Sequence, residues 1–79
     1  MSTGAILVLN AGSSSIKFAI YEVESEPTEL TRGIIENLGP AALLKFEGSN
    51  GEGEQHELGA ADHSVALREI LNHASRILQ

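Results

Sequence analysis

Residues 10–17, which read Asn-Ala-Gly-Ser-Ser-Ser-Ile-Lys, form the one segment of this 79-residue sequence whose residue types and spacing go beyond scaffolding. Gly12 has no side chain, so its backbone can adopt a positive φ and can lie close to a ligand. Successive N–H groups around it can converge on an anion, and the hydroxyls of Ser13, Ser14 and Ser15 can add further donors. The segment therefore predicts a turn that binds phosphate.

Lys17 and Asn10 stand at the two ends of this segment. Lys17 follows Ser15 by two residues, so in an extended strand the two side chains share a face and the ammonium group could contact a phosphate held at the turn. Asn10 offers a neutral carbonyl oxygen, which suits a hard cation such as Mg²⁺ or a water molecule in its shell. The segment is not a Walker-type loop, because that loop needs a second Gly and a following helix. On spacing alone, a plain hairpin turn with solubilising serines and an outward Lys17 fits equally well.

The elements on either side of the turn are predicted to be strands. Ala5–Leu9 is a short apolar run with β-branched residues, which is typical of a buried strand. After the turn, apolar residues recur at every second position, at Ile16, Phe18 and Ile20, as in a strand with one buried face. The turn therefore joins two strands as a hairpin. Further strands are expected at residues 30–38, 41–46 and 55–58, preceded or separated by turns at 24–29, 39–40 and 48–53.

From Asp62 onward the apolar spacing changes to three and four residues, which predicts an amphipathic helix over residues 62–79. Asp62 is the expected N-cap, because its carboxylate can accept from the free amides of the first turn. The apolar pattern reaches the last residue without a Gly cap or a Pro stop, so we expect residues 1–79 to be one partial domain of a longer chain. The expected fold class is α/β. Taken alone these residues would be α+β, an antiparallel or mixed β-meander over residues 1–58 followed by the helix.

Composition and charge exclude several function classes. The formal net charge is −6, and residues 21–60 hold nine Glu against Arg32 and Lys45, so the sequence offers no basic surface for nucleic acid or an anionic membrane. The absence of Cys excludes disulfides, thiolate metal sites and thiol chemistry. The longest apolar stretch is far shorter than the about 20 residues of a membrane-spanning helix. We therefore expect a cytoplasmic protein.

Residues 6–18, with the sequence Ile-Leu-Val-Leu-Asn-Ala-Gly-Ser-Ser-Ser-Ile-Lys-Phe, closely resemble the amino-terminal signature of the acetate kinase family. That family lies within the wider superfamily of actin-like proteins, sugar kinases and heat-shock ATPases, which implies a ribonuclease H-like fold. Most of the superfamily starts this hairpin with Asp, whereas the acyl-phosphate-forming kinases have Asn, as at Asn10 here. Weaker similarity continues through residues 32–36 and the helix start at Asp62 and His63.

The resemblance implies a phosphotransferase with a carboxyl group as acceptor, which transfers a phosphoryl group reversibly between ATP and acetate to give ADP and acetyl phosphate. It also implies Mg²⁺ or Mn²⁺, a two-domain fold and a homodimer. By position in the motif, Asn10 would have the metal-associated role and Lys17 would contact nucleotide phosphate. Ser13 and Ser15 would hydrogen-bond the phosphoryl group beside Gly12. The family's other catalytic residues lie downstream of this stretch, so we expect the stretch to be inactive alone.

Two alternatives stay open. A propionate or butyrate kinase would use the same scaffold, because the side chains that size the acyl pocket are not in this stretch. A non-catalytic interaction module would use the hairpin as a structural turn and dock a partner on its acidic surface or its helix. The histidines do not decide between them. His56 is expected in a polar loop, and His63 and His73 are ten residues apart on a mostly solvated helix. None of the three has metal-ligand spacing to another, so we expect all of them at the surface.

Overall fold

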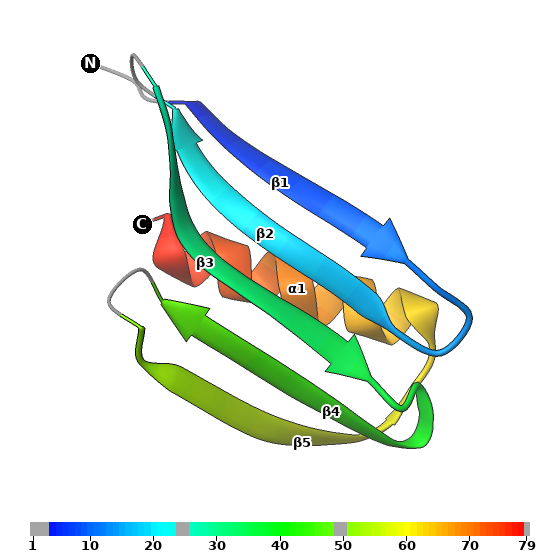
Figure 1. Ribbon diagram of the computed structural model, residues 1–79. Coiled ribbons are helices and arrows are strands. Elements are labelled where there is room, and N and C mark those ends of the chain that lie inside the picture. The colour runs from blue at the N-terminus through cyan, green and yellow to red at the C-terminus, as the bar shows by residue number, and fades with distance from the viewer. Residues whose placement is uncertain (1–3, 24–25, 49–50, 79) are drawn as a thin grey trace.

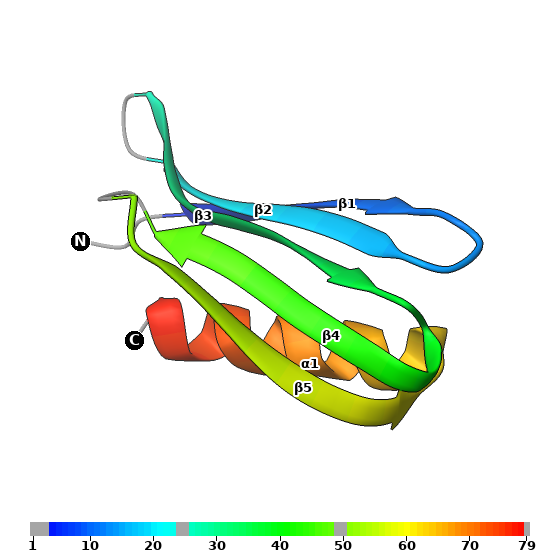
Figure 2. The same ribbon diagram turned by 60° about the horizontal axis from the view of Figure 1, so that its bottom comes forward.

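The computed structural model describes residues 4–23, 26–48 and 51–78, which form a five-stranded sheet and one helix. Each strand pairs antiparallel with the next one along the chain, and the helix lies across one face of the sheet (Figures 1 and 2). The elements are β1 (Gly4–Ala11), β2 (Ile16–Val23), β3 (Pro27–Glu36), β4 (Gly39–Gly48), β5 (Gly53–Ala61) and α1 (His63–Ile77). The prediction of a β-meander followed by one helix is confirmed, and the sheet is antiparallel rather than mixed.

The third strand begins earlier than the sequence predicts. β3 starts at Pro27 rather than at residue 30, although its first residues are polar. The reason is pairing with the end of β2, where Val23 lies directly opposite Pro27. Ladder hydrogen bonds between the strands therefore outweigh the weak strand propensity of the segment. Parts of the expected turns, residues 24–25 and 49–50, lie outside the described residues.

The fourth and fifth strands also extend beyond the predicted residues 41–46 and 55–58. They pair with each other over most of their length, ending with Gly39 opposite Ala61. This pairing includes glycines and alanines of low strand propensity, which a reading of local composition misses. His56 lies within β5, inside the predicted strand 55–58, so the expectation that it lies in a polar loop is wrong.

The hydrophobic core lies between α1 and the sheet face that α1 covers. Alternate residues of β2, which are Ile16, Phe18 and Ile20, point to this face and are buried, as their spacing of two predicts. The helix adds its own buried residues at three- and four-residue steps. The other buried apolar residues of the core are Ile35, Ala42, Leu44, Ala61, Ala66, Ile70 and Ala74.

The helix begins as predicted, but one of its polar residues is not where we expected it. The carboxylate Oδ1 of Asp62 accepts from the N–H of Val65 at 2.9 Å, which confirms Asp62 as the N-cap. His73, expected on the solvated side, is only 5% exposed. It follows Ile70 by three residues, and side chains at that spacing share a helix face, so His73 is carried into the core.

Gly33 makes room for the Phe18 ring in this core. A Cβ atom at Gly33 would lie 2.5 Å from the carbonyl oxygen of Lys45 and 2.7 Å from the Phe18 ring, so no larger residue fits without displacement. Phe18 and Phe46 flank Gly33 on the neighbouring strands. The His73 ring packs edge-on against them, with ring centroids 4.0 Å from Phe46 and 5.9 Å from Phe18. The missing side chain of Gly33 is thus part of how α1 docks on the sheet.

The first strand is less buried than the sequence predicts. β1 pairs with β2 and forms the edge of the described sheet (Figure 1). Ile6, Val8 and Leu9 are consequently 47%, 48% and 43% exposed, although the run Ala5–Leu9 has the composition of a buried strand. Among the residues that the structure describes, no helix has the length and apolar character needed to span a bilayer.

Candidate functional site

Residues 12–15 form the turn between β1 and β2. Across this turn the N–H of Gly12 donates to the carbonyl oxygen of Ser15 at 2.7 Å. Gly12 does not adopt the positive φ that its lack of a side chain would permit. A Cβ atom at Gly12 would lie 3.5 Å from the Oγ atom of Ser15, which is ordinary van der Waals contact. The turn therefore does not need glycine for its own conformation, and what Gly12 provides is an unobstructed backbone.

Two contacts from distant parts of the chain anchor the turn by its carbonyl groups. The N–H of Leu38, between β3 and β4, donates to the carbonyl oxygen of Ser14 at 3.0 Å. His63, the first residue of α1, places Nε2 2.9 Å from the carbonyl oxygen of Gly12. All three segments lie at the same end of the molecule (Figure 1). In the described part of the chain no carbonyl group accepts from the N–H groups of residues 13–15. These donors are therefore available to an anion.

Asn10 and Lys17 lie directly opposite each other on β1 and β2, and both are exposed on the face that α1 does not cover. Both line a shallow hollow of about 790 Å³ in that face. Among the described residues no carboxylate forms an ion pair with Lys17, whereas Lys45, on the same face, pairs with Glu36 at 2.7 Å. The ammonium group of Lys17 is therefore free to neutralise a bound anion.

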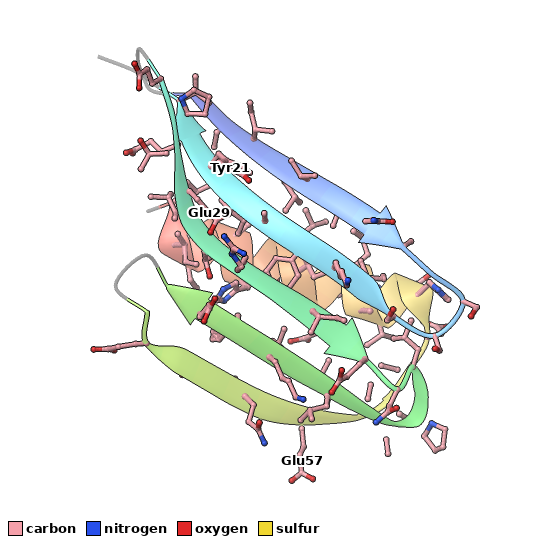
Figure 3. All side chains as sticks on the ribbon, in the orientation of Figure 1. Tyr21, Glu29 and Glu57 are labelled. Atoms are coloured by element: carbon pink, nitrogen blue, oxygen red, sulfur yellow. The ribbon has the colours of Figure 1, made fainter. Side chains whose placement is uncertain are left out.

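Farther along the same face, the charged groups are already engaged with one another. Figure 3 shows Tyr21 and Glu29 side by side on β2 and β3, and the Tyr21 hydroxyl donates to Glu29 Oε2 at 3.3 Å. Arg32 donates from Nε to Glu29 Oε1 at 2.8 Å, and this hydrogen bond raises the pKa of the Arg32 guanidinium. Glu57 points away from the sheet at the β5 edge (Figure 3). This arrangement leaves Lys17, next to the turn, as the better placed cation for a ligand.

The structure brings some of the predicted site residues together and separates others. Asn10 and Lys17 share the open hollow, whereas Ser13 lines a second hollow of about 510 Å³ between the turn and the start of α1, together with His63. Ser15 is not part of β2, which begins one residue later, so the argument that Ser15 and Lys17 share a strand face does not hold. The binding roles assigned to these residues stay predictions.

Sequence reasoning missed the contact between His63 and the turn. His63 is exposed, as expected, but its ring reaches a carbonyl group 51 positions earlier in the chain. Nothing in the spacing of the two residues indicates this contact, because it arises only when the meander brings the start of α1 beside the first hairpin. The one sequence signal at His63 was its place at a helix start that resembles the acetate kinase family.

A metal ion could take at most part of its ligands from this stretch. The amide oxygen of Asn10 is a suitable neutral ligand for Mg²⁺, which prefers oxygen atoms. The described residues contain no group of three or more His, Asp or Glu side chains that could hold a metal ion. Asn10 therefore fits as one oxygen ligand of a site completed by phosphate, water or residues outside this stretch.

Comparison with known proteins places the chain in one family. Residues 5–78 match the acetokinase family model. The chain is 42% identical to the acetate kinase of Bacillus subtilis over 67 residues. The matched stretch covers 85% of this chain and 17% of that protein. It is 44% identical to the acetate kinase of Stutzerimonas stutzeri over 72 residues, and this stretch covers 90% of this chain and 18% of that protein.

A solved structure shows the same arrangement of strands and helix. The crystal structure of Porphyromonas gingivalis acetate kinase superposes with a TM-score of 0.76 at 38% sequence identity, over 85% of this chain and 17% of that one. The chain therefore spans less than a fifth of the length of these relatives.

Proposed function

The chain belongs to the acetokinase family, and from this premise we propose that residues 1–79 are the amino-terminal part of an acetate kinase. The proposed reaction is reversible phosphoryl transfer from ATP to acetate. A carboxylate oxygen of acetate attacks the γ-phosphorus, the bond from that phosphorus to the ADP oxygen breaks, and acetyl phosphate and ADP leave. Such a reaction depends on positioned donors and cations around the phosphoryl group more than on a nucleophilic side chain.

The observation that carries this proposal is the turn at residues 12–15 with Lys17 beside it. The turn has three N–H groups without a carbonyl acceptor among the described residues, and the ammonium group of Lys17 has no carboxylate partner there. An anion with several oxygens, such as the terminal phosphate of a nucleotide, matches that combination of donors and charge.

We assign the following roles within this proposal. Lys17 contacts nucleotide phosphate and offsets the negative charge that shifts during transfer. The hydroxyls and amides of Ser13 and Ser15 donate to the phosphoryl oxygens, and Gly12 leaves their approach unobstructed. Asn10 contributes one oxygen ligand to Mg²⁺ or Mn²⁺, and that ion, when bound, neutralises phosphate charge.

The wider setting of the reaction follows from the family resemblance. We propose that residues 1–79 form part of the first domain of a two-domain kinase that works as a cytoplasmic homodimer. The hairpin at residues 10–17 would then supply one wall of the nucleotide site, and the remaining catalytic groups would come from the rest of the protein. Propionate and butyrate are the competing substrates.

The experiment that tests the proposal is an activity assay on the full-length protein with ATP and Mg²⁺. Acetyl phosphate is trapped with hydroxylamine and measured as the hydroxamate, and propionate and butyrate are assayed in parallel. We expect turnover with the highest kcat/KM on acetate, and no turnover by residues 1–79 alone. Higher kcat/KM on propionate or butyrate would change the assigned substrate. Failure of all three acids, together with no binding of ATP, would favour a non-catalytic module.

A further inference from the structure

We propose that His63 is a positioning residue for the phosphate-binding turn. Through its hydrogen bond to the Gly12 carbonyl oxygen it holds the turn so that the N–H groups of residues 13–15 stay directed to a ligand. This inference rests on the proposed function for its catalytic consequence, but not for its structural part. His63 does not itself touch the reacting atoms in this proposal.

The chemistry of the contact defines what His63 does. Its Nε2 atom lies 2.9 Å from the carbonyl oxygen of Gly12, which can only accept a hydrogen bond. Nε2 must therefore carry a hydrogen, as it does in the Nε2–H tautomer of neutral histidine and in the imidazolium form. The contact fixes the direction of the peptide unit between Gly12 and Ser13, and with it the N–H of Ser13.

Two further hydrogen bonds also engage carbonyl groups of the turn. The Ser14 carbonyl oxygen accepts from the N–H of Leu38 at 3.0 Å, and the Ser15 carbonyl oxygen accepts from the N–H of Gly12 at 2.7 Å. With His63 included, three carbonyl groups of the turn are engaged within the protein. The protein thus satisfies the acceptors of the turn and leaves its donors for an anion, which is the arrangement an anion-binding turn needs.

A role of Nε2 as general acid or base does not fit the same geometry. The hydrogen on Nε2 is committed to Gly12, and the neighbouring Asp62 carboxylate accepts from the N–H of Val65. Nε2–H is a donor both in the neutral Nε2–H tautomer and in the imidazolium, so the contact itself requires no proton transfer. Loss of an anchor, unlike loss of a proton-transfer group, should lower kcat without changing the shape of its pH profile.

The test compares three variants of the full-length protein. His63→Ala removes the donor, and His63→Gln restores an N–H of similar reach. Ser64→Ala is the matched control, because Ser64 is the next residue of α1, is exposed and forms no hydrogen bond with the turn among the described residues. Each variant is measured for kcat and KM between pH 6 and 8.5 in about half-unit steps. Hydrogen exchange is measured without ligand at the amides of Gly12 and Leu38, whose N–H groups donate to carbonyl oxygens of the turn.

For His63→Ala we expect faster exchange at these amides and a lower kcat, each by about three- to tenfold, which is the factor that one hydrogen bond of ordinary strength corresponds to. The KM for acetate and the shape of the pH profile should not change. His63→Gln should recover most of both losses, and Ser64→Ala should match the unmodified protein.

The two readouts separate failure of this inference from failure of the proposed function. Unchanged amide exchange in His63→Ala would overturn the positioning role whatever the enzyme does. A changed pH profile, or no recovery with Gln, would overturn it in favour of a proton-transfer role. If the unmodified protein phosphorylates no carboxylic acid while His63→Ala still accelerates exchange at the turn, the proposed function fails and the anchoring of the turn stands.

Discussion

Two neighbouring rows of residues cross the sheet side by side and show opposite properties. The covered row, on the face packed against α1, contains Leu9, Phe18, Gly33, Phe46 and Glu54. The open row lies one residue further along β1, β3 and β5 and one residue back along β2 and β4. It contains Asn10, Lys17, Ile34, Lys45 and Gln55. Residues directly opposite each other on antiparallel strands share a face, so the two rows point to opposite sides of the sheet.

The difference between the rows separates stability from binding. In the covered row, Phe18 occupies the space that a side chain at Gly33 would need, and His73 packs against it from the helix. In the open row, Asn10 and Lys17 are exposed and line a hollow, and their positions follow from the pairing of β1 with β2. The pleat thus lets one pair of strands hold a packed core and a polar site one residue apart.

The largest effect is expected in the open row, from Lys17→Ala in the full-length protein. Loss of the ammonium group removes a charge that matters most as the phosphoryl group transfers, so kcat should fall by about 10²- to 10³-fold. Thermal stability should stay unchanged, because Lys17 is exposed and has no ion-pair partner among the described residues. Steady-state kinetics and thermal melting measure the two quantities.

Lys45→Ala is the matched control for this prediction. Lys45 lies in the same row, on the far side of Ile34, but its ammonium group is paired with Glu36 at 2.7 Å. We expect this variant to keep kcat within about twofold, since an exposed ion pair contributes little. Equal losses in the two variants would mean that the face acts through its overall charge. Full activity of Lys17→Ala would remove Lys17 from the site.

The covered row should give the opposite result with Gly33→Ala. The added Cβ atom would meet backbone at 2.5 Å and the Phe18 ring at 2.7 Å, so strands or ring must shift. We expect a loss of about 3 kcal/mol in the free energy of unfolding, at the upper end of what overpacking usually costs. Denaturant unfolding followed by circular dichroism measures it. The kcat of the molecules that remain folded should be nearly unchanged.

Gly53→Ala tests whether glycine in this sheet is generally required. A Cβ atom at Gly53 would lie 3.8 Å from the Phe46 carbonyl oxygen, which is ordinary contact. We expect this variant to be as stable as the unmodified protein or slightly more so, because alanine restricts the unfolded chain. If Gly33→Ala behaves in the same way, Gly33 is not required for the packing of α1.

The sequence predicts what local spacing determines. The alternation at Ile16, Phe18 and Ile20, the turn after β1, and the Asp62 N-cap each depend on residues close in sequence, and the structure contains all three. The open-face position of Lys17 beside Asn10 also follows from this alternation. The phosphate-binding roles of these residues are predictions that only ligand binding can test.

The parts that the sequence did not predict depend on which elements meet in space. β1 has the composition of a buried strand, yet among the described residues it has a partner on one side only. His63 contacts Gly12, and His73 packs against Phe18 and Phe46, because of where α1 docks. A single histidine occurs in polar and in apolar surroundings, so the sequence alone does not indicate whether its side chain faces solvent, a carbonyl group or the core.

His73 gives the smallest expected effect and the sharpest test of the covered face. Its Nε2 atom is buried and has no hydrogen-bond partner among the described residues. Burial lowers the pKa of His73, with a smaller contribution in the same direction from Arg76, while Glu54 raises it and His56 lowers it slightly. The folded protein therefore favours the neutral ring, as expected for an imidazole packed edge-on against Phe46.

This shift makes stability depend on pH in a defined window. In the unfolded chain a histidine has a pKa of about 6.5, so as the pH falls below that value the unfolded state binds the proton first. The free energy of unfolding should then decrease by at most about 1.4 kcal/mol per pH unit, and level off below the pKa of the folded state.

Thermal melting between pH 7.5 and 5 in about half-unit steps, with an NMR titration of the His73 ring, measures the slope and the pKa. His73→Phe, which keeps an aromatic ring against Phe18 and Phe46, should lose this slope, whereas His56→Gln at an exposed position should keep it. A His73 pKa at or above 6.5, or an unchanged slope in His73→Phe, would show that protonation does not disturb the packing of α1 on the sheet.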